Sequence, residues 1–292
     1  SAPSTLLTSL ALLKDSPFMK TTSAAPAPFL LHEGQSPLMI SIPHVGTYIP
    51  PEIANRLQTH ALAVADTDWH LDVLYEFAKA LDITVLQATH SRYVVDLNRP
   101  PDNANLYPGQ NTTGLCPIDD FAEQAIYLPG QEPSESEIAQ RVIHYWQPYH
   151  EQLQQQLSRL KNQHPQVILW DAHSIASQVP RFFEGQLPDF NFGTADHNSC
   201  PTSISDLLID IMKQNSHISY VLNGRFKGGY ITRQYGNANS NVYAIQLEMS
   251  QQLYMSEQAP FEYLATPASR VQVVLKQLLA QLQRVLSLPS TS

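Results

Sequence analysis

The sequence predicts an α/β fold with a mostly parallel or mixed central sheet and helices on both faces. From residue 37 onward, apolar strand-like segments alternate with segments of helical periodicity, the pattern of parallel strands joined by crossover helices. The chain has 292 residues, 43% of them hydrophobic, which is enough for one large core without a metal or disulfide. No internal repeat or linker follows residue 36. We therefore expect a single domain over residues 37–292.

Residues 1–36 are rich in Ser, Ala, Thr and Pro, which predicts an extended N-terminal arm. Its apolar stretch at residues 6–13 has no basic segment before it, so we expect no signal peptide. No apolar run reaches the roughly 20 residues that a membrane span requires. We therefore expect a cytoplasmic protein without membrane contact.

The elements of the first half follow from apolar runs and their periodicity. Residues 38–45 are an apolar run that ends at His44 and predicts a buried strand. Residues 68–81 repeat apolar side chains every three or four positions, which predicts a helix. The β-branched segments 83–90 and 92–98 predict two further strands.

The longest predicted helix covers residues 136–163, where apolar side chains recur at steps of three and four. Ser134, with Glu137 three positions later, is a capping-box signature at its start. Pro148 lies inside the pattern and predicts a kink or a break, because proline removes a backbone donor.

The second half continues the alternation. Apolar and β-branched character predicts strands, and amphipathic periodicity predicts helices. In chain order these are a strand at 167–174, a helix at 203–214, strands at 218–226 and 241–250, and a C-terminal helix at 269–286.

Charge and cysteine content narrow the class of protein. The net charge is −9 and no run of Lys or Arg occurs, which argues against a nucleic-acid-binding protein. A small anionic ligand stays possible, because a pocket's local potential decides its attraction. Cys116 and Cys200 show no metal-binding spacing and fit a reducing compartment.

Polar side chains gather at the carboxyl ends of four predicted strands, the edge where open α/β sheets bind ligands. These side chains are His44, Asn98, Arg99, Asp171, His173 and Glu248. We therefore expect them to lie close together in the folded chain.

Two histidines and a carboxylate are typical ligands of a catalytic zinc ion, with one position left open. His44 and His173 are the candidate imidazoles, and the carboxylate comes from Asp66 or Asp68. Each residue alone has a simpler structural role, such as capping of the helix at 68–81 by either aspartate. Only their joint placement indicates a metal, with Asp171 as a partner that orients His173.

Motifs of other hydrolases and of nucleotide-binding proteins are missing from the sequence: GxSxG, GxxxxGK[ST], GxGxxG and HExxH. The segment GRFKGGYITR combines three glycines with Arg225, Lys227 and Arg233. Such a loop can hold an anion through backbone N–H groups and cations, or it can be a turn with solvated charges.

Eight segments occur in order over about residues 36 to 256, and as a set they are highly specific. They are SIPHVGTYIP, DTDWHLDVLY, SRYVVDLNRPPDNANLYPGQ, YWQPYHEQL, LWDAHSIAS, FFEGQLPDFNFGT, GRFKGGYITRQYG and AIQLEMSQQLYM. In these segments the chain resembles the N-formylglutamate amidohydrolases, or N-formylglutamate deformylases, of histidine degradation. The resemblance implies a zinc-exopeptidase (phosphorylase/hydrolase)-like fold. It also implies hydrolysis of N-formyl-L-glutamate to L-glutamate and formate.

The resemblance also implies roles for individual residues. His44 and His173 are the implied metal-binding histidines. Glu248 is the implied general base, and Asn98 with Arg99 is the implied pair that binds a substrate carboxylate.

The related exopeptidases take their acidic ligand from HxxE, but Thr47 stands at that position here. Asp68 is our choice for the acidic ligand over Asp66, which then joins Asp171 in the supporting shell. Zn²⁺ is the expected metal, with Co²⁺, Ni²⁺ and Mn²⁺ as alternatives. For the second substrate carboxylate our choice is Arg233, with Arg92 and Arg225 as competitors.

Two other functions stay open. One is a zinc deacylase or carboxypeptidase-like hydrolase that acts on another N-acyl acidic amino acid. The other is a non-catalytic protein that binds acidic amino acids, although such a protein needs no general base like Glu248.

Overall fold

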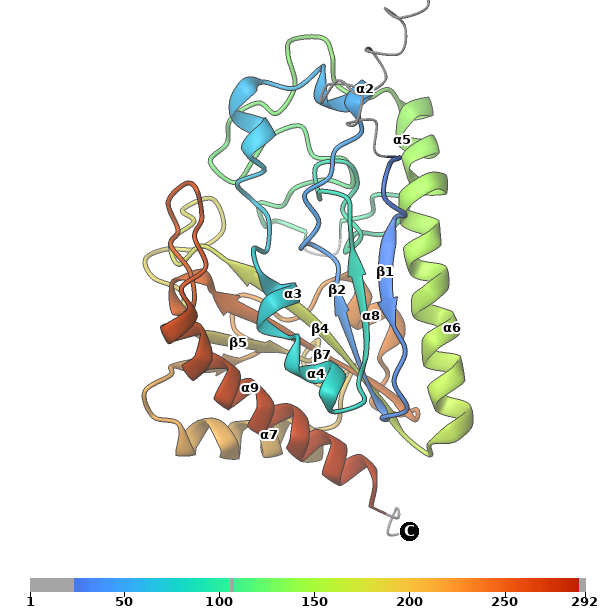
Figure 1. Cartoon of the computed structure of the whole chain (residues 1–292), viewed down its shortest axis with the longest axis vertical. Helices are drawn as coiled ribbons and strands as arrows, with labels where there is room; N and C mark the ends of the chain where they lie inside the picture. Colours follow the sequence, from blue (N-terminus) through green and yellow to red (C-terminus); the bar gives the residue numbers. More distant parts are fainter. Residues whose placement is uncertain (1–23, 106–107, 289–292) are drawn as a thin grey trace, which may run out of the picture.

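A computed structural model of the chain describes residues 24–105 and 108–288. Its centre is a mixed seven-stranded sheet with the order β1-β3-β2-β4-β7-β5-β6 (Figure 1). The strands are β1 Phe29–His32, β2 Leu38–Ile42, β3 Thr84–Ala88, β4 Val167–Ile175, β5 Phe190–Gly193, β6 Tyr220–Leu222 and β7 Val242–Ser250. The α/β class with a mixed sheet is thus confirmed.

Parallel pairing holds the middle of the sheet together. Strand β2 pairs in parallel with β3 and β4, and β4 pairs in parallel with β7. The edge strand β1 runs antiparallel to β3, and β5 runs antiparallel to β7. The long β4–β7 register sets His173 beside Glu248, so two predicted site residues become neighbours across the ladder.

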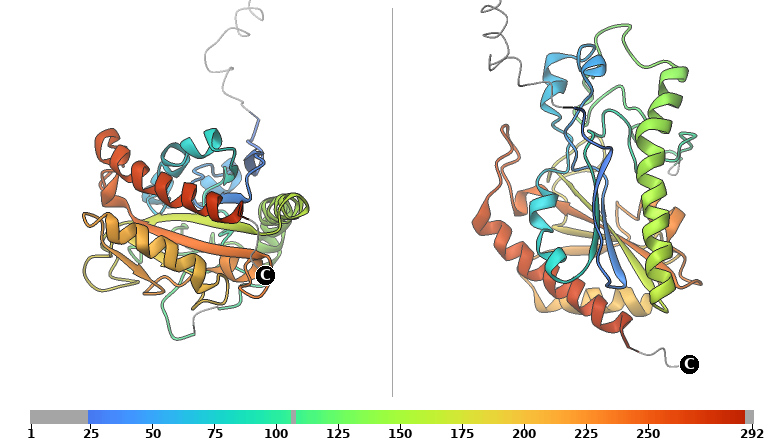
Figure 2. Two further views of the ribbon diagram at one scale, coloured as in Figure 1. Left: turned by 90° about the horizontal axis from the view of Figure 1, so that it is seen from below. Right: turned by 45° about the vertical axis from the view of Figure 1, so that its right-hand side comes forward.

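Helices surround this twisted sheet, and α9 runs across its strands (Figure 2). The helical elements are α2 Pro51–Ala54, η1 Thr59–Ala63, α3 Leu71–Leu74, α4 Phe77–Ala80, α5 Glu135–Arg141, η2 Val142–Trp146, α6 Gln147–Gln163, α7 Thr202–Gln214, α8 Tyr230–Tyr235, η3 Gln251–Leu253 and α9 Ala265–Leu286. None of the helices in the described ranges is long and apolar enough to span a membrane.

The period-two alternation of the strands divides the core into two clusters. Ile40 and Trp170 belong to a cluster with side chains of α3, α4, α7 and α9. Met39 and Leu169, one position away on the same strands, belong to a cluster with side chains of α6 and α8. Both faces of the central strands are therefore buried, as their continuous apolar sequences require.

The structure confirms the predicted strands at 38–45, 83–90, 167–174 and 241–250, with small shifts at their ends. The predicted helices at 203–214 and 269–286 are confirmed as α7 and α9. The strand predicted at 218–226 is reduced to β6, and the helix predicted at 68–81 is divided into α3 and α4. Strands β1 and β5 and helix α8 were not predicted from the sequence.

The strand predicted at 92–98 is wrong, because this segment forms turns. Short polar side chains bind the local backbone there: the Asn98 N–H donates to Asp96 Oδ1 at 2.9 Å, and the Tyr93 N–H donates to Ser91 Oγ at 3.1 Å. Such bonds compete with a strand ladder. The β-branched composition of this segment therefore does not predict its structure.

The long helix at 135–163 is continuous through a π-helical turn, η2. The predicted cap is confirmed, since the Glu137 N–H donates to Ser134 Oγ at 3.2 Å. The predicted break at Pro148 is wrong, because Pro148 stands in the first turn of α6, directly after η2. Proline is tolerated there because the hydrogen-bond pattern changes at this point: the Gln147 N–H still donates to Val142 O in the π-helical pattern, and Pro148 follows where that pattern ends.

Part of the predicted N-terminal arm contributes to the sheet as β1, which pairs with β3. The first 23 residues of that arm lie outside the described residues.

Candidate functional site

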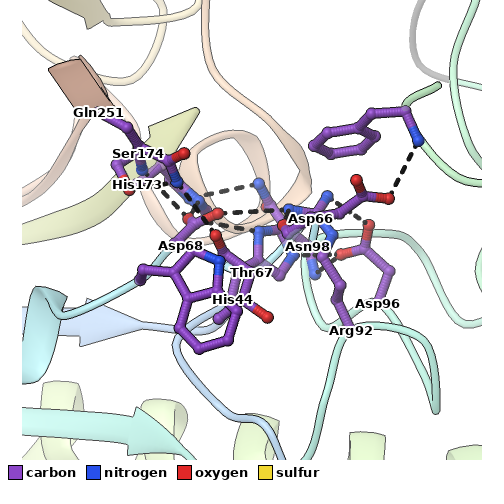
Figure 3. A network of polar contacts seen from close by, with 12 residues as sticks. His44, Asp66, Thr67, Asp68, Arg92, Asp96, Asn98, His173, Ser174 and Gln251 are labelled. Atoms are coloured by element: carbon purple, nitrogen blue, oxygen red, sulfur yellow. Dashed lines mark hydrogen bonds and ion pairs between the residues drawn. The ribbon is translucent and has the colours of Figure 1, made fainter. Parts of the chain in front are cut away.

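Three buried side chains, His44, Asp68 and His173, converge at the carboxyl ends of the central strands (Figure 3). One ligand atom from each lies within 4.8 Å of the others. Asp68 Oδ2 is 3.2 Å from His173 Nδ1 and 3.8 Å from His44 Nδ1. The three donors therefore face a common point.

The sheet and one loop bring these donors together. His44 follows β2, and His173 lies in the neighbouring parallel strand β4. Asp68 lies in the loop before α3, and its N–H donates to the carbonyl of His44 at 2.9 Å. This bond ties the loop to the end of β2.

Each histidine ring is held on its far side by a buried carboxylate. His44 Nε2 lies 2.5 Å from Asp96 Oδ1, and His173 Nε2 lies 2.5 Å from Asp171 Oδ2. A carboxylate at this position keeps a proton on Nε2, so in the neutral form of each ring the lone pair lies on Nδ1. Two Nδ1 atoms and one carboxylate oxygen form a donor set that fits a divalent cation.

The charges around His44 and His173 differ. Burial by itself lowers the pKa of His173, but the carboxylates of Asp171 and Asp68 together raise it well above 6.5. Burial lowers the pKa of His44, with a further contribution from Arg92. His173 thus lies where a positive charge is most favoured, between two carboxylates.

Arg92 contacts the second carboxylate oxygens of Asp68 and Asp96. Its Nη1 lies 3.4 Å from Asp68 Oδ1, and its Nη2 lies 3.5 Å from Asp96 Oδ2. The guanidinium also stands over the ring of Phe121, with Cζ 4.8 Å from the centroid. Arg92 therefore turns Asp68 so that its Oδ2 faces the two histidines.

Glu248 lies in β7 opposite His173 and lines the same cavity. Burial raises its pKa to about 8, and the nearby Asp68 carboxylate adds to this rise while His173 and Arg92 oppose it. A carboxyl group with a pKa near neutrality can both accept and donate a proton.

The cavity beside the three donors is lined by three arginines and three phenylalanines. These are Arg92, Arg99, Arg225, Phe121, Phe182 and Phe226. It thus offers positive charge and apolar walls, a combination that suits a small anionic molecule.

Asn98 and Arg99 form another side of the cavity. Asn98 Nδ2 lies 3.5 Å from His173 Nε2, and its Oδ1 accepts from the Ile231 N–H at 2.9 Å. A Cβ at Gly229 would lie 2.4 Å from Asn98 Nδ2, so only glycine fits there. The Arg99 Nε–H donates to the Thr113 carbonyl at 3.0 Å.

The π-helical turn and the start of α6 hold the backbone on both sides of Asn98. The Trp146 Nε1–H donates to the carbonyl of Arg99 at 2.9 Å. His150 Nε2 lies 2.8 Å from the carbonyl of Leu97, to which it donates. Burial lowers the pKa of His150 to about 4, so its ring is neutral at neutral pH.

Of the remaining predicted site residues, Arg233 lies outside the cavity, whereas Asp66 adjoins the donor group as a supporting residue, with its carbonyl 3.4 Å from Arg92 Nη1. Arg233 is exposed on α8, outside the lining of the cavity, and its Nε–H donates to the carbonyl of Gly228 at 3.0 Å. Asp66 lies outside the donor group, and its Oδ2 accepts from the Phe121 N–H at 3.0 Å. Burial raises the pKa of Asp66 to about 6. The choice of Arg233 is thus unsupported by its position.

Sequence reasoning missed the role of Asp96 as the partner of His44. The motif DLNR directed attention to Asn98 and Arg99, and no local spacing links Asp96 to a histidine 52 positions earlier. Asp171 was easier to place, because it alternates with His173 along one strand.

Comparisons with known proteins identify the family of the chain. The sequence model of the N-formylglutamate amidohydrolase family matches residues 36–255. An N-formylglutamate deformylase of Pseudomonas putida is 44% identical over 251 residues, which are 86% of this chain and 94% of that protein. An N-formylglutamate deformylase of Pseudomonas aeruginosa is 46% identical over 249 residues, or 85% of this chain and 93% of that protein.

Solved structures share the fold. The N-formylglutamate amidohydrolase of Ralstonia eutropha superposes with a TM-score of 0.76 and 24% identity, covering 89% of this chain and 98% of that one. A gene product of Agrobacterium tumefaciens superposes with a TM-score of 0.67 and 16% identity, covering 89% and 95% of the two chains. Family match, identity and fold agree, and the chain belongs to the N-formylglutamate amidohydrolase family.

Proposed function

We propose that this chain hydrolyses the formyl amide of N-formyl-L-glutamate to L-glutamate and formate. One observation carries the proposal: a buried set of two imidazole nitrogens and one carboxylate oxygen lies beside Glu248 in an arginine-lined cavity. Identities of 44% and 46% to two N-formylglutamate deformylases support the choice of substrate.

His44, Asp68 and His173 would hold a divalent cation, with Zn²⁺ as the first choice because these are typical catalytic zinc ligands. When bound, the cation supplies Lewis-acid polarisation of the amide carbonyl and lowers the pKa of water to about 7. Asp96 and Asp171 orient the two rings through their Nε2 atoms. The chain thus presents its donors already aligned.

Glu248 is the proton carrier of the proposed reaction. Its carboxylate takes a proton from the attacking water and passes it to the amide nitrogen. The second transfer is required because glutamate leaves poorly as an amide anion. Its raised pKa, about 8, makes Glu248 a stronger base than an exposed glutamate and a competent acid near neutral pH.

Asn98 and Arg99 are the proposed binding groups for the substrate carboxylate next to the reacting amide. Asn98 lies 3.5 Å from His173, so a group bound here is close to the donor set. The planar guanidinium of Arg99 can form two parallel hydrogen bonds with a carboxylate.

A substrate panel tests the proposal. The metal-loaded protein is assayed with the N-formyl, N-acetyl and N-succinyl derivatives of glutamate and of aspartate, and the free amino acid is measured. We expect the highest kcat/KM with N-formyl-L-glutamate. A higher value with an acetyl or succinyl derivative would instead identify a hydrolase of another N-acyl amino acid. Parallel loading with Zn²⁺, Co²⁺, Ni²⁺ and Mn²⁺ ranks the metals.

A further inference from the structure

The three arginines of the cavity have different surroundings. Arg92 is paired with Asp68 and Asp96, so two carboxylates of the protein offset its charge. Arg99 stands next to Asn98, which contacts His173. Arg225 comes from a third segment, the loop between β6 and α8.

Arg225 is fixed beside two phenylalanines that line the cavity. Its Nε–H donates to the carbonyl of Phe182 at 2.6 Å, and its Cζ lies 5.1 Å from the ring centroid of Phe226. The Phe182 ring meets Phe121 edge-on at 5.0 Å, and Phe121 in turn lies under Arg92. Contacts through Phe182 and Phe121 therefore connect Arg225 with Arg92.

A dicarboxylate substrate needs two cationic contacts at different distances from the reacting bond. In N-formyl-L-glutamate the α-carboxylate is close to the amide, and the side-chain carboxylate lies two methylene groups further from the α-carbon. Both arginines line the cavity: Arg99 adjoins Asn98, which contacts His173, and this suits the near carboxylate. Arg225, held beside Phe182 and Phe226, is then the cation available for the far one. A carboxylate buried against Phe182 and Phe226 without a cation would be strongly disfavoured.

We infer that Arg225 binds the side-chain carboxylate of the substrate and thereby selects glutamate over uncharged amino acids. The bond from its Nε to Phe182 and the ring of Phe226 set the plane of the guanidinium. A fixed plane favours bidentate binding and reduces the entropy lost when the ligand docks. Arg225 thus replaces Arg233 as the candidate for the second carboxylate.

The inference rests on the proposed function, and its test uses a substrate pair. N-formyl-L-glutamine keeps the shape of N-formyl-L-glutamate but has a neutral amide in place of the far carboxylate. Steady-state kinetics with both compounds are measured for the metal-loaded wild type, Arg225→Gln and Arg225→Lys. Arg233→Gln is the matched control, since it removes the same charge from an exposed site on the adjoining helix.

For Arg225→Gln we expect kcat/KM for N-formyl-L-glutamate to fall about 10- to 100-fold, the usual value of a hydrogen bond to a charged group. The loss falls mainly on KM, and kcat/KM for N-formyl-L-glutamine changes less than about threefold. Arg225→Lys recovers part of the loss, and Arg233→Gln resembles the wild type. Equal losses with both compounds, or no loss with N-formyl-L-glutamate, would overturn the assignment.

A binding measurement separates this inference from the proposed function. Calorimetric titration with L-glutamate and L-glutamine needs no turnover. If the wild type releases no formate but prefers L-glutamate, and Arg225→Gln abolishes that preference, the proposed reaction is wrong and the role of Arg225 stands. If formate is released but the preference survives Arg225→Gln, the proposed function stands and the role of Arg225 is wrong.

Discussion

Replacing Asp96 by asparagine perturbs the metal-binding group without touching any of its three donors. Asp96 Oδ1 lies 2.5 Å from His44 Nε2 and holds the ring proton there. An asparagine at this position has no negative charge to hold the ring proton on Nε2, and its amide N–H₂ would face either Arg92 or the Asn98 N–H and His44. His44 is then held less firmly with its Nδ1 lone pair toward Asp68, so Asp96→Asn weakens metal binding.

The size of the effect follows from the contacts. Loss of a carboxylate partner behind a metal-binding histidine costs about 10- to 100-fold in affinity, or about 1.4–2.8 kcal/mol. Asp96 also pairs with Arg92, and breaking a buried pair costs roughly 3–5 kcal/mol of folding free energy. We expect the lower end of that range, because Arg92 keeps its second partner, Asp68.

The assay combines metal competition against a chromogenic chelator with urea unfolding, with and without metal. The metal-dependent part of the unfolding free energy isolates the loss of affinity from the loss of the ion pair. Asp206→Asn, which changes an exposed carboxylate on α7, is the control. A folded Asp96→Asn protein with a metal Kd within twofold of the wild type would refute the reasoning.

Three other substitutions test the site and its support. Glu248→Gln should retain the metal and lower kcat by about 10²- to 10⁴-fold, the usual contribution of a general base, and near wild-type turnover would contradict its role. Gly229→Ala should cost both stability and activity, because the added Cβ lies 2.4 Å from Asn98 Nδ2; an unchanged melting temperature and KM would show that Asn98 is not held there. Burial lowers the pKa of His150 from 6.5 to about 4, so above pH 6.5 its ring is neutral in both the folded and the unfolded chain. Below pH 6.5 the unfolded chain binds a proton that the folded chain does not bind. The free energy of unfolding therefore falls between pH 6.5 and 4, by at most about 1.4 kcal/mol per pH unit. His150→Gln should therefore flatten the pH dependence of the unfolding free energy in this window, and identical slopes for both proteins would exclude the effect.

The central strands could be predicted because burial on both faces leaves continuous apolar runs, as at residues 38–45 and 167–174. The same property places His44 and His173, since the carboxyl ends of adjacent parallel strands share one edge. The short strands β1 and β5 carry too few residues to stand out, and their pairing partners decide their structure.

The surroundings of the donor group depend on contacts that no local pattern encodes. Asp96 reaches His44 because the segment at 92–98 turns instead of extending, and its side-chain bonds to the backbone decide this. Arg225 and Arg233 belong to one Gly-rich segment, and only the fold brings the first to the cavity and the second to the surface of α8.

The most direct test of the account is formate release from N-formyl-L-glutamate by the purified protein, with its metal content measured in the same samples. The account predicts that chelation removes both metal and activity, and that one equivalent of added Zn²⁺ restores both in the wild type but not in His173→Ala. Formate release that persists in fully metal-free protein, or in His173→Ala, would contradict the role of His44, Asp68 and His173 as a metal-binding group.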